Sequence, residues 1–372
     1  MRKPSNPFLV TGYHSPLYFC DRENELEWLM SQFQNERNAV ITAWRRLGKT
    51  ALIRHFFHHI NKSNMGETIY VDILGTTNLS EAHQRIASAV TSKYGHISKG
   101  ASSALLKLIS SIGANFTIDP LSGMPQVSVG MMPAKSVPAS LTAIGTFLNQ
   151  QKKPVVICID EFQQIVQYPE GNAEAMFRSW AQDHPMIRFI YSGSHRHMIE
   201  SMFSEQSRPF YRSAQLINLE HLPKEVYANF IRKQFRKAKQ NIKDEIIDDI
   251  FQWTRMQTYY SQLICNHLYG QGDISMNRLH EIYHKIIQQE IPIYSSYQQL
   301  MTSFQWKLLV SIAKDEIVKN PLAKEFISRH QLGAASSVSS ALKMLEKKEF
   351  ILRTQDGYII HDTLLMRWIQ AL

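Results

Sequence analysis

The sequence AVITAWRRLGKTALIRHFF spans residues 39–57, and its apolar start runs into a Gly48-Lys49-Thr50 turn before a helical pattern begins. A strand, a Gly-Lys-Thr turn and a helix in this order are typical of a phosphate-binding loop. Backbone N–H groups at the start of such a helix point at phosphates. We expect Lys49 to reach the β- and γ-phosphates and the Thr50 hydroxyl to bind Mg²⁺. The segment therefore predicts a site for a nucleoside triphosphate with Mg²⁺.

Ala43 stands where such a loop usually has its first glycine. A glycine there mainly eases a tight turn, so an alanine with a negative φ can serve instead. Trp44 is bulky where the chain turns over the phosphates, and we expect it to pack against a helical lid or a neighbouring loop. Arg45 and Arg46 could contact phosphate or a partner domain, and an ordinary surface position is the alternative for each. The loop residues expected around the nucleotide are Trp44, Arg45, Arg46, Leu47, Gly48, Lys49, Thr50 and Ala51.

A second motif, VVICIDEFQQI at residues 155–165, places an Asp-Glu pair at the end of an apolar strand. Asp160 is expected to hold Mg²⁺, directly or through water. Glu161 can orient or deprotonate the attacking water. These roles require the strand to end beside the phosphate-binding loop, and we expect it to lie next to the strand of that loop.

The segment FIYSGS ends a later strand with Ser192 and Ser194. Ser194 could reach the γ-phosphate or the attacking water and so assist catalysis. Alternatively, the two serines cap the turn and the helix that follows. Arg212 could act as an arginine finger or an inter-domain contact, and a plain surface arginine is the third interpretation.

Apolar strands alternate with amphipathic helices over the first 222 residues, which predicts an α/β fold. The strands are apolar on both faces, as expected for a parallel sheet with helices on both sides. Residues 99–135 contain several Gly and Pro residues and are expected to leave the main fold, with a hairpin as one option.

Strands disappear after Pro223, and four helical patterns follow. The last segment has three helical patterns and then two apolar runs around Asp356-Gly357, a hairpin signal. Three helices followed by a hairpin predict a winged helix. The expected domains are a nucleotide-binding α/β domain at 1–222, a helical lid at 223–294 and a winged helix at 295–372.

The net charge of +9 permits contact with nucleic acid without proving it. Its one local cluster, RKQFRKAK at residues 232–239, is either a solvated helix face or a phosphate contact. No apolar run is long enough to span a membrane. Three distant cysteines without pairing or metal spacing fit a reducing cytoplasm, which is the expected location.

The segment YFCDRENELEWL at residues 18–29 resembles the F-x-x-R-E-x-E-x-x-x-L box of many AAA+ and STAND-type P-loop ATPases. WRRLGKT, ICIDEFQQI and PFYRSAQLINLEHLP resemble further blocks in the same order. The whole chain thus resembles the archaeal-type AAA ATPases (the ATPase_2-like group), which are also common in Bacteroidetes and related in architecture to origin-recognition ATPases. The resemblance implies an adenine pocket near Phe19, Cys20, Asp21 and Arg22, and places Tyr260 and Gln262 of the lid near the nucleotide.

Two functions are compatible with these patterns. The first is a slow Mg²⁺-dependent ATPase that acts as a nucleotide-controlled switch, with the winged helix as its output domain. The second is an ATP-regulated DNA-binding protein. For the second, the third winged-helix pattern offers Ser336, Ser337, Ser339 and Ser340, and later Lys343, Lys347 and Lys348. Winged helices also bind proteins, so the partner stays open between DNA and protein.

Overall fold

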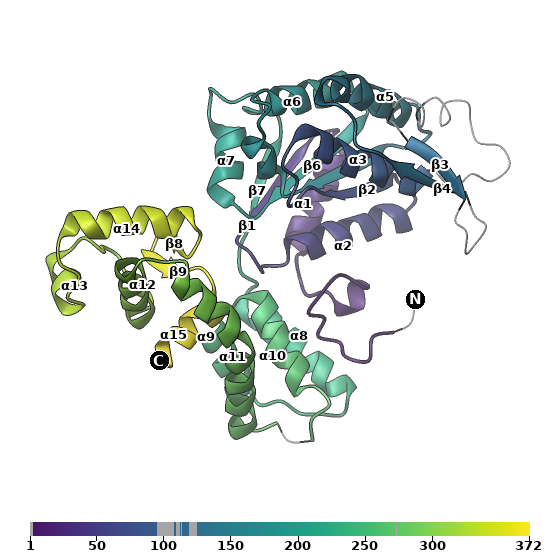
Figure 1. The fold of residues 1–372 in the computed structure, drawn as a ribbon. Coiled ribbons are helices and arrows are strands. Elements are labelled where there is room, and N and C mark those ends of the chain that lie inside the picture. Colours follow the sequence, from purple (N-terminus) through teal and green to yellow (C-terminus); the bar gives the residue numbers. More distant parts are fainter. Residues whose placement is uncertain (1–2, 95–107, 109–111, 113, 119–124, 273) are drawn as a thin grey trace. The chain divides into compact units, whose positions relative to one another are not determined.

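The structure is a computed structural model that describes residues 3–94, 108, 112, 114–118, 125–272 and 274–372. The chain divides into two compact units (Figure 1). One unit comprises Thr11–Val226, and the other combines the N-terminal segment up to Val10 with Tyr227–Leu372. No helix in the described part of the chain is both long and apolar enough to cross a membrane.

A five-stranded parallel sheet forms the centre of the Thr11–Val226 unit. The strand order is β2-β5-β6-β1-β7. The expectation that the Asp-Glu strand adjoins the loop strand is wrong, because β6 pairs with both β1 and β5 and lies between them. The strands are β1 (Ala39–Ala43), β2 (Glu67–Asp72), β5 (Val155–Asp160), β6 (Ile187–Gly193) and β7 (Gln215–Leu219).

Helices cover both faces of this sheet, as the apolar strands predict (Figure 1). On one face α1 and α2 pack on a core that includes Ile41 and Cys158. On the other face α3, α5, α6 and α7 pack on a larger core that includes Val40 and Ile157. Successive side chains of one strand thus pack into the cores on opposite faces of the sheet. The helices are α1 (Glu23–Gln34), α2 (Lys49–Lys62), α3 (Leu79–Tyr94), α5 (Val137–Asn149), α6 (Ala173–Asp183) and α7 (Arg196–Ser204).

The expected excursion contains a two-stranded antiparallel hairpin, with β3 (Ala114–Ile118) paired to β4 (Pro125–Val129). The rest of the excursion between residues 99 and 124 lies largely outside the described residues. Short 3-10 turns occupy η1 (Pro16–Tyr18), η2 (Ala134–Ser136) and η3 (Phe162–Gln167).

The second unit is helical and ends in the expected winged helix. The Asp356-Gly357 turn joins two antiparallel strands, which confirms the hairpin. α11 continues past residue 294, and α15 was not predicted. The three-domain division itself stays a prediction. The elements are α8 (Lys224–Lys237), α9 (Asp244–Thr254), α10 (Thr258–Leu268), α11 (Met276–Gln299), α12 (Ser303–Asp315), α13 (Lys324–Arg329), α14 (Ala335–Lys347), β8 (Ile351–Arg353), β9 (Tyr358–Ile360) and α15 (Thr363–Gln370).

The N-terminal segment packs on this unit through the Phe8 side chain. Phe8 is fully buried, and its ring contacts Phe235 at 5.1 Å and Tyr269 at 5.9 Å. Its carbonyl accepts a hydrogen bond from the Asn266 side chain, and the Asn6 amide donates to the Asn266 carbonyl. This reciprocal pairing fixes the segment on α8 and α10.

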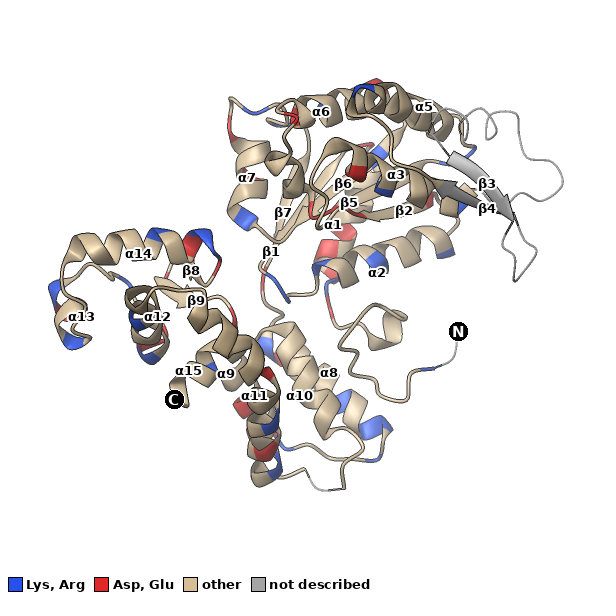
Figure 2. Ribbon diagram, viewed as in Figure 1, with Lys and Arg blue, Asp and Glu red and all other residues tan. Residues whose placement is uncertain are grey.

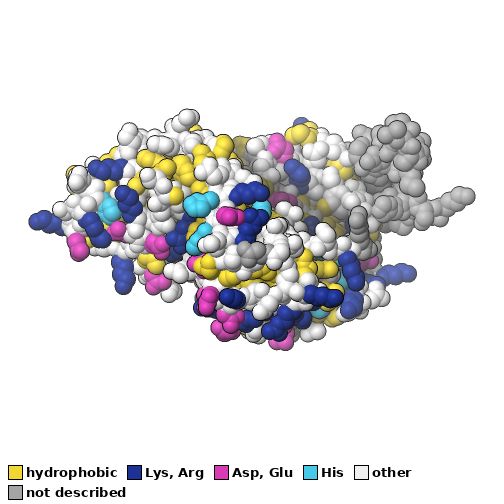
Figure 3. Space-filling model, turned by 90° about the horizontal axis from the view of Figure 1, so that it is seen from below, with side chains coloured by type: hydrophobic (Ala, Val, Ile, Leu, Met, Phe, Trp, Pro, Cys, Tyr) yellow, Lys and Arg dark blue, Asp and Glu magenta, His cyan; other side chains and the backbone are white. Residues whose placement is uncertain are grey.

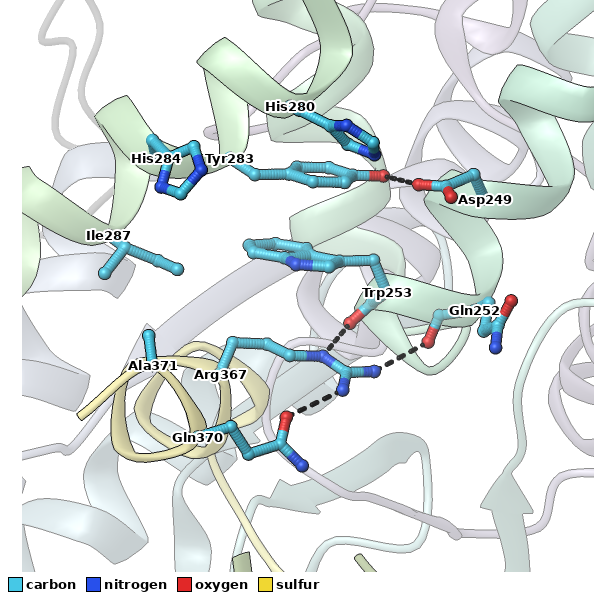
Figure 4. A pocket seen from close by; sticks show the side chains of 10 residues that line it. All are labelled: Asp249, Gln252, Trp253, His280, Tyr283, His284, Ile287, Arg367, Gln370 and Ala371. Atoms are coloured by element: carbon cyan, nitrogen blue, oxygen red, sulfur yellow. Dashed lines mark hydrogen bonds between the residues drawn. The ribbon is translucent and has the colours of Figure 1, made fainter. Parts of the chain in front are cut away.

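Arg367 of α15 ties the winged helix to α9 (Figure 4). Its guanidinium donates to the carbonyls of Gln252 and Trp253, both at 3.0 Å, and forms an ion pair with Glu316 at 2.8 Å. These carbonyls belong to the last turn of α9, whose acceptors have no partner within the helix. Trp253 in turn stacks on Tyr283 of α11, with ring centroids 4.1 Å apart. The three helices surround a cavity of about 520 Å³.

We expect Arg367→Ala to weaken α9 locally. Hydrogen bonds to a charged group contribute about 2 kcal/mol, so amide exchange in α9 should accelerate about 30-fold when measured by native-state hydrogen exchange. Arg278→Ala is the matched control, because its pair with Glu281 is exposed on both sides and such pairs contribute little. Equal protection of α9 in both variants would show that Arg367 does not stabilise the helix end.

Candidate nucleotide site

The phosphate-binding loop has the backbone that the sequence predicts. Ala43 ends β1, is buried, and has no positive φ. The left-handed turns fall instead on Arg46 (φ +71°) and Gly48 (φ +94°). A Cβ at Gly48 would meet no atom within 4 Å, so glycine serves the backbone conformation and leaves the surface open to a phosphate. Alanine at position 43 is therefore compatible with a complete loop.

Lys49 begins α2 and is almost fully buried. Its ammonium lies 2.7 Å from Asp160 Oδ1 and 3.2 Å from Glu161 Oε1. The structure thus brings together the lysine and the two carboxylates that the sequence placed about 110 residues apart. Buried charges need such compensation, because an unpaired one is strongly disfavoured.

Three hydroxyl groups surround the Asp160 carboxylate. Ser192 Oγ donates to Oδ1 at 2.6 Å, while Thr50 Oγ1 at 3.2 Å and the Tyr70 phenol donate to Oδ2. Burial raises the pKa of Asp160, but Lys49 and these hydrogen bonds outweigh it and hold the pKa below its usual range. Burial and the neighbouring carboxylate raise the pKa of Tyr70, so its hydroxyl remains a donor. Asp160 is therefore ionised, and the hydrogen bonds fix the orientation of its carboxylate.

Glu161 follows the strand in a left-handed conformation, with φ +57° and ψ +39°. The turn directs its carboxylate towards the end of β6, where Ser194 Oγ donates to Oε2 at 2.8 Å and the Ser194 amide at 3.3 Å. Gln163 Nε2 donates to the same oxygen at 2.7 Å. Burial raises the pKa of Glu161, but Lys49 and these donors lower it by more, so the net shift is downward. Glu161 is therefore ionised at neutral pH, as a general base must be.

These residues fit Mg²⁺ and a triphosphate. Thr50 Oγ1 and Asp160 Oδ2 lie side by side, and hydroxyl, carboxylate and phosphate oxygens are the ligands that Mg²⁺ takes. Gly48 leaves room for a phosphate, and Lys49 supplies the cation. Mg²⁺ held by Thr50 and Asp160 would neutralise charge between the β- and γ-phosphates.

The residues expected around adenine lie beside the same helix. Phe19 stacks on His55 of α2, with ring centroids 4.2 Å apart. Asp21 and Arg22 both have positive φ just before α1. The buried Arg22 guanidinium donates to the carbonyl of Leu47 in the phosphate-binding loop at 3.4 Å. The adenine contacts themselves stay predictions.

Trp44 packs against the neighbouring α7. Its ring lies 5.9 Å from His197, and the Arg196 guanidinium carbon is 5.6 Å from its centroid. Arg45 and Arg46 are exposed. Arg212 is also exposed, with its guanidinium carbon 5.2 Å from the Tyr211 centroid. The expected packing of Trp44 against a lid or a neighbouring loop stays a prediction.

Tyr260 and Gln262 belong to the other compact unit, on α10. Tyr260 is buried there, and its hydroxyl donates to Asp362, which caps α15. A place for either residue near the nucleotide stays a prediction from the family resemblance.

Two residues that contact the carboxylates, Tyr70 and Gln163, were not predicted from the sequence. Tyr70 pairs in register with Cys158 of β5, so its hydroxyl reaches a carboxylate that lies 90 residues away in sequence. Only the strand order could have indicated this contact. Gln163 carries a local signal, because it lies two residues after Glu161 in the motif already recognised.

Replacement of Lys49 by Met should reverse the pH dependence of the free energy of unfolding that the two carboxylates contribute. In the wild type the lowered carboxylate pKa values contribute stability above about pH 4, which is lost as the pH falls through the folded-state values. Without the cation, burial raises both pKa values, so the variant loses stability as the pH rises above about 4. We expect a loss of about 3 kcal/mol at pH 7.5 and a smaller one at pH 5.

Urea denaturation in EDTA at both pH values measures this difference. Lys49→Arg is the control, because it keeps the positive charge. A loss in the methionine variant that does not change with pH contradicts the charge compensation described above.

Two family profiles match parts of this sequence. The sequence profile of ATPase domains predominantly from Archaea matches residues 19–259. The profile of a probable winged helix domain matches residues 292–371. A search of curated proteins found no match.

Several solved structures share the fold at low sequence identity. The Walker-type ATPase paby2304 of Pyrococcus abyssi superposes with a TM-score of 0.66 at 18% identity, covering 98% of this chain and 99% of that one. The Aeropyrum pernix ORC2 protein, in ADPNP–ADP complexes, gives 0.58 at 13% identity and 97% coverage of both chains. The Aeropyrum pernix ORC1 protein in complex with DNA gives 0.55 at 11%, covering 99% and 96%.

The profile match extends over more than half of the chain and includes the phosphate-binding loop and the Asp-Glu motif. The chain therefore belongs to the family of ATPase domains found predominantly in Archaea, and it carries a C-terminal winged helix domain.

Proposed function

We propose that the protein binds Mg²⁺ and ATP at Lys49, Thr50 and Asp160, hydrolyses ATP slowly, and uses the bound nucleotide as a switch. The observation that carries this proposal is the convergence of Lys49, Asp160, Glu161 and Ser194. In this assignment Lys49 binds the β- and γ-phosphates, and Glu161 accepts a proton from the attacking water. Ser194 lies where its hydroxyl can reach the γ-phosphate or that water.

Slow turnover follows from the contacts of Glu161. Both of its carboxylate oxygens already accept from Lys49, Gln163 or Ser194. A general base must reach the proton that it removes. Glu161 therefore has to exchange the Lys49 donor at Oε1 for water before it can act, while Gln163 and Ser194 hold Oε2, and each turnover includes that exchange.

A series of contacts links the phosphate-binding loop to the end of the sheet. Arg196 lies over Trp44 and also pairs with Glu200 at 2.8 Å and with Glu220 at 3.3 Å. Arg22 donates to the Glu220 carbonyl at 2.7 Å as well as to the loop carbonyl of Leu47. Glu220 directly follows β7 on the way to α8. A loop that shifts with the γ-phosphate would thus act on the segment that leads into the helical unit, which is the local event that a switch needs.

Glu161→Gln should bind ATP and fail to hydrolyse it. Loss of a general base costs about 100-fold or more in turnover, while the phosphate contacts of Lys49 remain. We expect unchanged affinity for labelled ATP and at least this loss in phosphate release. Glu205→Gln, an exposed glutamate on the same unit, is the control for the change of charge. Wild-type turnover by Glu161→Gln removes Glu161 from this role.

DNA binding is a second candidate function, and the outer face of α14 supports it. Five of its side chains are exposed and polar or cationic: Ser336, Ser337, Ser340, Lys343 and Lys347. Figure 2 shows further Lys and Arg on α12 and α13. Hydroxyl groups and cations of this kind contact phosphates and base edges. The structurally similar Aeropyrum pernix ORC1 protein is bound to DNA, which is compatible with this candidate. On the face in Figure 3, Lys and Arg side chains are interspersed with Asp and Glu.

A salt titration tests this candidate. If α14 contacts DNA phosphates, Lys343→Ala with Lys347→Ala should reduce the slope of log K against log salt by about two. Lys62→Ala with Lys93→Ala removes the same charge from exposed positions of the ATPase unit and should leave the slope unchanged. Failure of the wild type to bind a mixed-sequence duplex at low salt excludes the candidate.

A further inference from the structure

We propose that Gln163 is a positioning residue that holds the Glu161 carboxylate in the orientation needed to activate water, an inference that rests on the proposed hydrolysis of ATP. Its side-chain amide is the closest donor to Glu161 Oε2, at 2.7 Å. Ser194 donates to the same oxygen from the end of the neighbouring strand β6, and Lys49 contacts the other oxygen. Gln163 thus completes a set of donors that fixes both oxygens of the carboxylate.

The turn that carries Gln163 is itself firmly anchored. Phe162 is fully buried, with its ring centroid 4.5 Å from that of Tyr191 and 5.2 Å from that of Phe210. Ile165 is buried as well, and the Gln164 amide donates to the Thr76 carbonyl at 3.0 Å. Side chains on a fixed turn hold a catalytic group more precisely than side chains on a loose loop.

The Gln163 side chain occupies the space beside Gly193. Gln163 is only 3% exposed, and a Cβ at Gly193 would collide with its Oε1. A side chain at position 193 would therefore displace the amide from Glu161. Glycine at the end of β6 leaves this space free, between the serines that contact the two carboxylates.

The carbonyl oxygen of the Gln163 amide also supports a role in orienting Glu161. Gln163 Oε1 is buried and has no hydrogen-bond partner among the described residues. A buried acceptor without a partner is unfavourable, so an apolar side chain would suit the position better for stability alone. The donor end, in contrast, meets a carboxylate. We infer that Gln163 serves the orientation of Glu161 rather than the packing of the turn.

The orientation of the Glu161 carboxylate has to be imposed by its neighbours, because its backbone is strained and its oxygens can accept from several donors. Its left-handed φ and ψ are uncommon for a residue with a side chain and persist only when the surroundings impose them. Without Gln163, Oε2 would keep only the Ser194 donors, and the carboxylate could rotate towards Lys49. A Glu161 carboxylate that turns towards Lys49 is no longer oriented to accept a proton from the attacking water.

Gln163→Met tests the inference, because it keeps the length of the side chain and removes the donor. We expect kcat for ATP to fall at least tenfold while KM changes less than twofold, since Gln163 touches Glu161 and none of the phosphate-binding residues. Gln164→Met is the matched control. It makes the same substitution at the next residue, whose amide donates to a backbone carbonyl away from the carboxylates. Its kcat should stay within twofold of the wild type.

The same substitution in the Glu161→Gln background separates positioning from a structural role. If Gln163 acts through Glu161, Gln163→Met should change the residual single-turnover rate less than twofold there. Equal losses in both backgrounds, or a raised KM at unchanged kcat, overturn the inference. Should the methionine variant fail to fold, Gln163→Leu keeps most of the buried side-chain volume without a donor or a charge and must show the same kcat loss.

The wild type distinguishes a failure of this inference from a failure of the proposed function. Wild-type turnover together with equal kcat values for Gln163→Met and Gln164→Met rejects the positioning role alone. A wild-type chain that binds ATP without hydrolysing it rejects the proposed hydrolysis, and the inference with it.

Discussion

One buried cation holds the site together. The Lys49 ammonium contacts Asp160 from the strand end and Glu161 from the turn that follows. Each group would be strongly unfavourable in this interior by itself, so loop, strand and turn can only be stable together. The same arrangement sets up the chemistry. A phosphate that binds Lys49 competes with the carboxylates for its N–H groups, and Glu161, held at the longer distance, is the one more easily released.

The strand order then decides which side chains can reach these charges. Because β6 lies between β1 and β5, its end places Ser192 and Ser194 beside Asp160 and Glu161. On the far side of β5, β2 brings Tyr70 to the same aspartate. The order of the sheet, rather than any single motif, therefore supplies the surroundings of the acidic pair.

Local features of this fold could be predicted from the sequence, and long-range ones could not. The loop at Lys49, the Asp160–Glu161 strand end and the Asp356-Gly357 hairpin all follow from residue types at short spacing. The position of β6, the contact of Tyr70 with Asp160 and the anchoring of Phe8 depend on pairing between distant segments, for which periodicity carries no signal. α15 was missed for another reason. It is a short helix, and the local signal for its start is a single N-cap residue, Asp362.

Several strained backbone positions lie around the same site. Asp21, Arg22, Arg46 and Glu161 all have positive φ although none is glycine. Such conformations cost about 1 kcal/mol or more and persist only where the surroundings over-determine them. Here the surroundings are identifiable: Arg22 is bonded to the carbonyls of Leu47 and Glu220, and Glu161 to Ser194 and Gln163. A ligand that exchanges any of these hydrogen bonds also removes a reason for the strained backbone to stay in place. If binding at the phosphate-binding loop exchanges these hydrogen bonds, the chain at Arg22 and Glu220 can move without any new contact there, and these bonds are then the physical basis of the switch proposed above.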